Sequence, residues 1–249
     1  MIKNTVMKYL ILISACLIVV IPLVVVILGS LKTHADFFES GAFDLPKTLH
    51  FENFRIAFED DKVMQGLINT AIILVVSCAG TIVTGTMPAF VVQRFNMLFT
   101  RFIKTVFLGV ALLPGISMQV TVFQIVHMLG IYDTLAAPII LYIGTDIISI
   151  YIFIQFLNNI SVSLDESAIL DGCSYPRVYF SIILPMLRPA IATVLVIKLV
   201  SIYNDFYTAK LYMPSDGLEV VSTALYRFIG PLGSKWEIIF AGIIICIIP

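Results

Sequence analysis

Long apolar stretches, separated by shorter polar ones, form most of this chain. A helix of about 20 apolar residues crosses the hydrocarbon core of a bilayer, which is about 30 Å thick. Five stretches are long enough to do so: 9–31, 67–92, 102–129, 135–156 and 183–203. A sixth begins near Trp236, but its apolar part, 238–249, has 12 residues and reaches only ~18 Å. The pattern predicts an all-α membrane protein with six spans, the sixth of them truncated in this chain.

The first stretch has two possible interpretations, because Lys3 and Lys8 precede it as they would precede the core of a secretory signal peptide. The apolar part of a signal peptide has about 7–15 residues and is followed by a cleavage site with small residues. Stretch 9–31 is longer, and no small-x-small site follows it. We therefore expect a retained first span.

Composition supports the membrane class. Apolar residues make up 59% and charged residues 12% of the chain, and the mean hydropathy is +1.02. Soluble domains have about half and about a quarter, respectively. With a net charge of -1, the chain does not have the excess of basic residues that is typical of nucleic-acid-binding proteins. The four cysteines show neither metal-binding spacing nor a disulfide framework. We expect an integral membrane protein in contact with lipid, with no nucleic acid partner and no metal site.

The polar connections differ in length and charge. Stretch 32–66 is long and rich in acidic residues, whereas the connection with Arg94, Arg101 and Lys104 is short and basic. Lys and Arg in short loops favour the cytoplasmic side. Both sides hold the same number of these residues, but those on the side of the N-terminus lie in the shorter loops. We expect residues 1–31 to form a cytoplasmic N-terminus and the first span, and residues 32–66 to form an extracytoplasmic loop.

A polar run between the fourth and fifth spans interrupts the apolar pattern. Its residues Ser163-Leu164-Asp165-Glu166 match a capping box, in which a Ser hydroxyl and a Glu three residues later satisfy backbone N–H groups at a helix start. We expect a helix from Leu164 to about Leu170, ended by Gly172 in the left-handed conformation. Ser174 is expected to begin a second helix. Capping signals alone are also compatible with an ordinary amphipathic connector.

The whole loop, at about 161–188, resembles the Glu-Ala-Ala…Asp-Gly…Ile-x-Leu-Pro loop of the membrane subunits of ABC importers. The matching positions are Glu166, Ala168, Asp171, Gly172, Phe180, Ile182, Leu184, Pro185 and Pro189. Ser167 and Cys173 depart from the pattern, both toward other small residues. In that family the loop is a short cytoplasmic helix that docks into a separate ATPase subunit. The resemblance implies a coupling role for Glu166, Ser167, Ala168, Asp171, Gly172, Leu184 and Pro185.

Three further segments resemble the same family in chain order: Asn69-Thr70, 130–134 and 203–206. Together they are similar to the carbohydrate permeases of maltose and multiple-sugar type, and to the second subunit of the permease pair. The resemblance implies a permease core at 67–249 and transport by alternating access. It also implies a second permease subunit, an ABC ATPase dimer that holds the ATP, and an extracytoplasmic solute-binding protein as partners.

Ionisable side chains at the centre of a bilayer cost roughly 2.5–3.5 kcal/mol, so each of them suggests a role. Asp146 lies in the middle of the fourth span and Lys198 in the fifth, with Asn204 and Asp205 near its outer end. Asn204 and Asp205 are candidates for the solute pathway. Alternatively, Asp205 lies among lipid headgroups, and Lys198 snorkels to the interface or is buried in the bundle.

A different class of function would use Asp146, Lys198 and Asp205 in an intramembrane enzyme or an ion channel. The sequence has no catalytic dyad with motif spacing, no phosphate-binding loop, no H-E-x-x-H and no G-x-S-x-G. We therefore expect a transport subunit that is not an enzyme, binds no cofactor itself and leaves ATP hydrolysis to a partner chain.

Overall fold

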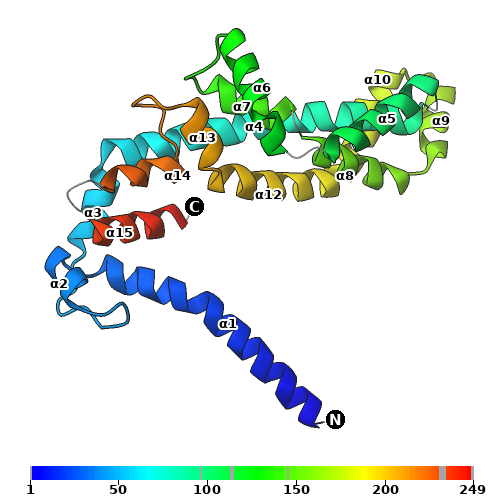
Figure 1. Ribbon diagram of the computed structural model, residues 1–249. Coiled ribbons are helices and arrows are strands. Elements are labelled where there is room, and N and C mark those ends of the chain that lie inside the picture. The colour runs from blue at the N-terminus through cyan, green and yellow to red at the C-terminus, as the bar shows by residue number, and fades with distance from the viewer. Residues whose placement is uncertain (1, 96, 113–114, 145, 230–233, 248–249) are drawn as a thin grey trace. The chain divides into compact units, whose positions relative to one another are not determined.

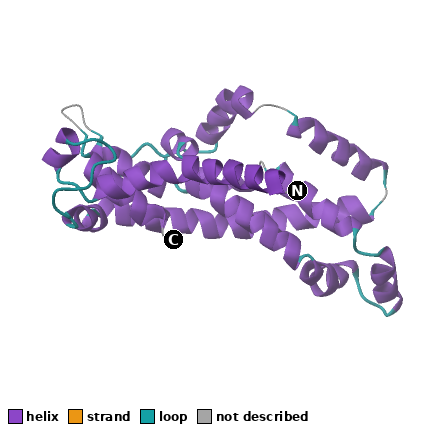
Figure 2. Ribbon diagram, turned by 90° about the horizontal axis from the view of Figure 1, so that it is seen from below, coloured by secondary structure: helices purple, strands orange, loops and turns teal. Residues whose placement is uncertain are grey.

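A computed structural model of the chain describes residues 2–95, 97–112, 115–144, 146–229 and 234–247. Within these residues every regular element is a helix, and Figure 2 shows helices joined by loops. The prediction of an all-α chain is therefore confirmed. The helices gather into two compact units: unit 1 consists of Met1–Ile68 and Glu219–Pro249, and unit 2 is Asn69–Leu218.

Unit 1 combines helices from both ends of the sequence. Its elements are α1 (Ile2–Ser30), α2 (His34–Glu39), α3 (Glu52–Glu59), the start of α4 (Asp61–Arg94), α14 (Val221–Ala224), the 3-10 helix η2 (Leu225–Phe228) and α15 (Trp236–Ile247). α15 packs against α1 and α3. No residue in the most apolar 18-residue window of α1 is buried within the chain. An apolar surface of this length needs lipid or other apolar helices around it.

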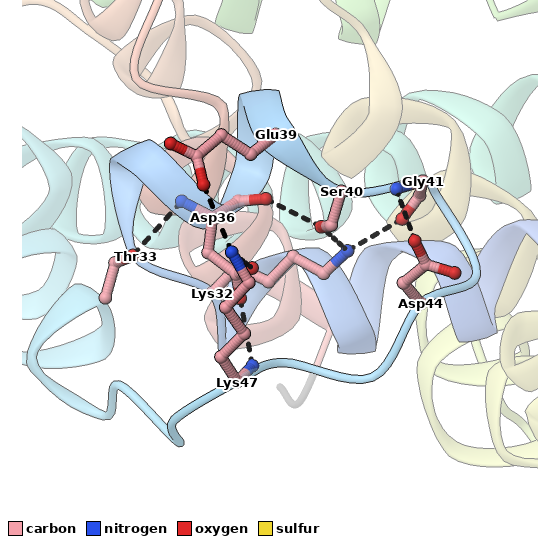
Figure 3. A network of polar contacts seen from close by, with 8 residues as sticks. All are labelled: Lys32, Thr33, Asp36, Glu39, Ser40, Gly41, Asp44 and Lys47. Carbon is pink, nitrogen blue, oxygen red and sulfur yellow. Dashed lines mark hydrogen bonds and ion pairs between the residues drawn. The ribbon is translucent and has the colours of Figure 1, made fainter.

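The polar segment between α1 and α3 is ordered by short-range hydrogen bonds (Figure 3). Lys32 is buried, and its Nζ donates to Ser40 Oγ at 2.7 Å and to the Gly41 carbonyl at 2.8 Å. The backbone N–H of Lys47 donates to Asp36 Oδ2 at 3.1 Å. These contacts hold residues 32–47 together, so the stretch predicted as a long acidic loop has a defined structure.

Unit 2 contains the polar loop and most of the predicted spans. Besides most of α4, its elements are α5 (Leu98–Ala111), α6 (Gly115–Met128), α7 (Ala136–Gly144), α8 (Ile147–Asn158), α9 (Val162–Leu170), α10 (Tyr175–Val178), the π-helical turn η1 (Tyr179–Ile183), α11 (Leu184–Met186), α12 (Arg188–Asn204) and α13 (Tyr207–Tyr212). Its core includes the fully buried Phe153, Leu157, Val178, Ile183 and Leu187. In Figure 1, α9 and α10 lie at one end of unit 2 and α7 and α13 at the other.

Two of the predicted spans are single long helices. Met7–Ser30 and Lys62–Arg94 are long and apolar enough to cross a membrane, and counting each bent helix pair as one span raises the number to as many as four. The third predicted span is divided between α5 and α6, and the fourth between α7 and α8. The sixth corresponds to α15, a shorter apolar helix that ends at Ile247, and residues 248–249 lie outside the described residues.

The fifth predicted span differs from a simple helix beginning at residue 183. Tyr175–Met186 and Arg188–Asn204 are bent by 68° at Leu187. Pro189 lies in the first turn of α12 and has no N–H with which to continue the preceding helix. The helix therefore breaks before Pro189 and restarts, with the N–H of Ile191 donating to the Leu187 carbonyl at 2.8 Å.

Candidate functional site

The first helix of the polar loop, α9, begins earlier than the sequence predicted. Its N-cap is Ser161, whose hydroxyl accepts a hydrogen bond from the backbone N–H of Ser163 at 3.3 Å. The predicted capping box of Ser163 and Glu166 is therefore wrong, because both residues lie inside the helix. Ser161 is the same residue type as Ser163, so it caps equally well and allows a longer helix.

The end of α9 is as predicted. Asp171 is the C-cap, and Gly172 follows with a φ of +86°. The N–H of Gly172 donates to the Ile169 carbonyl and the N–H of Cys173 to the Ala168 carbonyl, both at 2.9 Å, which are the two hydrogen bonds of a Schellman motif. No atom lies within 4 Å of the position that a Cβ at Gly172 would occupy. The left-handed backbone alone therefore demands glycine here.

α9 has a buried face and an exposed face. Asp165 and Ala168 are buried, whereas Leu170 is 87% exposed. Four of the predicted coupling residues are also exposed, on this helix and on the turn that ends it: Glu166, Ser167, Asp171 and Gly172. Leu170 offers a binding partner an apolar contact surface, and the nearby carboxylates of Glu166 and Asp171 offer it negative charge. The structure thus brings these four predicted residues together and turns Ala168 toward the core.

The second half of the loop packs inward. α10 begins after Ser174, as predicted, and leads through the π-helical turn η1 into α11. Leu184 and Pro185, the last two predicted coupling residues, lie in α11 and are half-buried. Leu184 packs against the apolar core of unit 2. These two residues therefore lie at the base of the loop, in a different environment from the exposed residues of α9.

A buried ion pair fastens α9 to the end of α4. Arg94 Nε lies 2.6 Å from Asp165 Oδ2, and the two side chains are 5% and 7% exposed. The Arg94 guanidinium also donates through Nη2 to the Ile160 carbonyl at 3.1 Å. Burial raises the pKa of the Asp165 carboxyl, and the positive charge of Arg94 opposes this rise. Breaking such a pair by removing one partner costs roughly 3–5 kcal/mol, because the other charge stays buried.

A second polar cluster lies where the fourth predicted span is interrupted. Asp146 is not in the middle of a helix, as a continuous span would place it, but is the N-cap of α8. Its carboxylate accepts a hydrogen bond from the backbone N–H of Ser149 at 3.2 Å and another from the Ser149 hydroxyl. Negative charge is favourable at this position, because the N-terminal end of a helix carries unpaired N–H groups and a positive dipole.

Lys198 of α12 balances this charge. Its Nζ lies 2.9 Å from Asp146 Oδ2 and donates to the Tyr142 carbonyl at 2.7 Å. The Lys198 and Asp146 side chains are 13% and 11% exposed, which supports the interpretation of Lys198 as buried in the bundle. Tyr142 lies in the last turn of α7, where carbonyls have no partner within the helix. One ammonium group therefore satisfies the end of α7 and the start of α8 together.

The same cluster reaches the candidate pathway residues. The Tyr142 hydroxyl donates to Asp205 Oδ2 at 2.9 Å, and the N–H of Thr208 donates to Asp205 Oδ1, also at 2.9 Å. Asn204 is exposed, and its Nδ2 donates to the Val200 carbonyl one turn earlier at 2.9 Å. Asp205 thus links α12 to α7 and to the start of α13. We call Asp146, Lys198, Tyr142 and Asp205 the span cluster.

The sequence pattern did not predict the roles of two residues in these sites, Arg94 and Tyr142. Arg94 counted only as a basic residue in a short loop, and Tyr142 only as part of an apolar stretch. The signal for Arg94 was its position directly at the end of a span, opposite a loop with several carboxylates, but the sequence does not say which carboxylate it meets. For Tyr142 no sequence signal exists, because the partner of its hydroxyl is Asp205, the C-cap of α12, 63 positions away.

The helical fold and its long apolar helices are those of a multi-pass membrane protein. The chain belongs to the family of binding-protein-dependent transport system inner membrane components, whose profile matches residues 77–249. This membership confirms the resemblance to ABC importer permeases and shows that the chain is a transport component, not an enzyme on its own.

The chain is similar to several curated permeases. It is 28% identical over 232 residues to the probable starch degradation products transport system permease protein AmyC of Thermoanaerobacterium thermosulfurigenes, covering 92% of this chain and 83% of that one. It is 24% identical over 231 residues to the melibiose/raffinose/stachyose import permease protein MelC of Bacillus subtilis (strain 168), with the same coverage.

A solved structure has the same fold. It is the crystal structure of a bacterial ABC transporter involved in the import of the acidic polysaccharide alginate, one chain of which matches with a TM-score of 0.90 and 17% identity. The match covers 99% of this chain and 92% of that one. The ABC importer permease fold predicted from the sequence is therefore confirmed. The alternative of an intramembrane enzyme or ion channel is not favoured.

Proposed function

We propose that this chain is the second permease subunit of an ATP-driven carbohydrate importer and works by alternating access. The names of the similar permeases, which concern starch degradation products and the sugars melibiose, raffinose and stachyose, support the solute class. The proposed partners are another permease subunit, an ABC ATPase dimer and an extracytoplasmic solute-binding protein. ATP would be bound and hydrolysed by the ATPase dimer.

The observation that carries the coupling proposal is the two-faced character of α9. Its buried face is tied to unit 2 through Asp165 and Ala168, whereas Glu166, Ser167 and Leu170 are open to a partner. A short helix that is fixed on one side and exposed on the other can act as a rigid lever. We propose that it docks on the ATPase from the cytoplasmic side and that closure of the ATPase dimer moves it.

Asn204 and Asp205 are the proposed contacts of the solute along the pathway. Both lie at the junction of α12 and α13, at the end of unit 2 away from α9 in Figure 1. A hydroxyl-rich solute needs hydrogen-bonding groups that compensate for the loss of water. The amide of Asn204 and the carboxylate of Asp205 have the chemistry for this role.

Reconstitution tests the proposed function. The complex of both permease subunits, the ATPase and the binding protein would be placed in proteoliposomes, and ATP-dependent uptake of maltotriose and raffinose would be compared with that of an amino acid and a dipeptide. We expect uptake of at least one of the two sugars and none of the other solutes. Uptake confined to the amino acid or the dipeptide would contradict the carbohydrate proposal.

A further inference from the structure

Side chains at the end of α4 contact both the end of α8 and the start of α9. Arg94 reaches the Asp165 carboxylate inside α9 and the Ile160 carbonyl just before its N-cap. The preceding residue, Gln93, donates from Nε2 to Oδ1 of Asn158, the last residue of α8. Two neighbouring side chains of one long helix therefore fix the points where the polar loop starts.

The contacts of Arg94 have a directional character that apolar packing lacks. A guanidinium is planar and holds its N–H groups in a fixed geometry, and here Nη2 donates to the Ile160 carbonyl while Nε forms an ion pair with Asp165. Asp165 Oδ1 is buried and has no hydrogen-bond partner among the described residues. The carboxylate therefore depends on Arg94, and loss of Arg94 would leave α9 held mainly by apolar side chains such as Ala168, which allow sliding and rotation.

We propose that Arg94 and Asp165 are positioning residues that clamp α9 to the end of α4, so that a displacement of α9 is transmitted to a membrane-spanning helix and not absorbed within the loop. This proposal rests on the proposed function of α9 as the helix that docks on the ATPase. It adds the path of transmission: from the exposed face of α9, through the ion pair, into α4.

The test uses the complete importer in proteoliposomes and measures the amount of sugar taken up per ATP hydrolysed. The variants are Arg94→Gln, Asp165→Asn, the double variant and Arg94→Lys. Lys104→Gln is the matched control, because it removes one positive charge from an exposed residue of α5 close to Arg94 in sequence. We expect Arg94→Gln and Asp165→Asn each to lower uptake per ATP by roughly 3- to 30-fold.

Two further results are expected from the clamp. The double variant should be no worse than the worse single variant, because both changes remove the same interaction. Arg94→Lys keeps the charge but offers no planar pair of donors, so its uptake per ATP should lie between that of the wild type and that of Arg94→Gln. Lys104→Gln should behave as the wild type.

Several outcomes would overturn the clamp. One is a wild-type ratio of uptake to ATP hydrolysis in assembled Arg94→Gln or Asp165→Asn complexes; another is multiplication of the single effects in the double variant. Failure of both Asp165→Asn and Arg94→Lys to assemble would assign the pair to assembly and not to coupling. Failure of the proposed function is distinguishable, because the unchanged chain would then not import sugar on addition of ATP.

Discussion

Replacement of Gly172 by valine tests whether transport needs the turn at the end of α9, because it should strain this turn without destabilising the rest of the permease. A φ of +86° costs a residue with a side chain about 1–2 kcal/mol, and valine, being β-branched, lies at the upper end. One or two kcal/mol change an equilibrium by a factor of roughly 5–30. Since no atom lies within 4 Å of the added Cβ, the cost falls on the Schellman turn. We expect the end of α9 to fray while the rest of unit 2 folds normally.

Gly130 provides a matched control within the same unit. It has a φ of +67°, and no atom lies within 4 Å of its hypothetical Cβ. Its N–H donates to the His127 carbonyl at 3.0 Å and the N–H of Ile131 to the Val126 carbonyl at 3.3 Å, the same Schellman pattern at the end of α6. Gly130→Val therefore imposes the same strain away from the polar loop.

The assay is ATP-driven sugar uptake by the reconstituted importer, with the yield of assembled complex measured in parallel. Gly172→Val should lower uptake roughly 5- to 30-fold at near-normal yield, and Gly172→Asn should be milder because asparagine tolerates the left-handed region. Gly130→Val should change uptake much less at a similar yield. Normal uptake by Gly172→Val, or an equal loss in Gly130→Val, would refute the reasoning.

Three further predictions concern the span cluster and the orientation. Lys198→Met should reduce the yield of assembled complex, since the stranded carboxylate costs roughly 3–5 kcal/mol; a normal yield on purification would contradict the ion pair. If Asp205 contacts the solute, Asp205→Asn should lower uptake at normal yield, whereas Tyr142→Phe, which removes only an internal donor, should not; equal uptake by both variants would remove Asp205 from the pathway. In a chain without its own cysteines, Leu45→Cys should react with an impermeant thiol reagent on intact cells and Ser167→Cys only after permeabilisation, and the reverse pattern would invert the topology.

Apolar length was sufficient to predict the helical class and the first two long helices. The α9 turn was also predictable, because a glycine that follows a short helix needs only local backbone chemistry to end it. The start of α9 was not, since Ser161 and Ser163 have the same capping chemistry and only the packed structure selects between them.

The interruptions of the apolar helices were beyond the sequence pattern for a physical reason. At the break before α8, Lys198, from a helix about 50 positions later, pairs with Asp146 and donates to a carbonyl at the end of α7. Likewise, the pairing of Arg94 with Asp165 joins segments 71 positions apart. Such partners are chosen by tertiary packing, which hydrophobic periodicity does not encode.

The central claim is that the exposed face of α9 docks on the ATPase, and site-specific photo-crosslinking tests it most directly. A photoreactive amino acid would be placed at Ser167, which is exposed on α9, and in a control chain at Met128, which is 85% exposed at the end of α6, a helix that packs against α7 and α13. The account predicts that position 167 forms a covalent product with the ATPase in the assembled importer and that position 128 does not. Absence of the product at 167, with transport intact, would contradict the account.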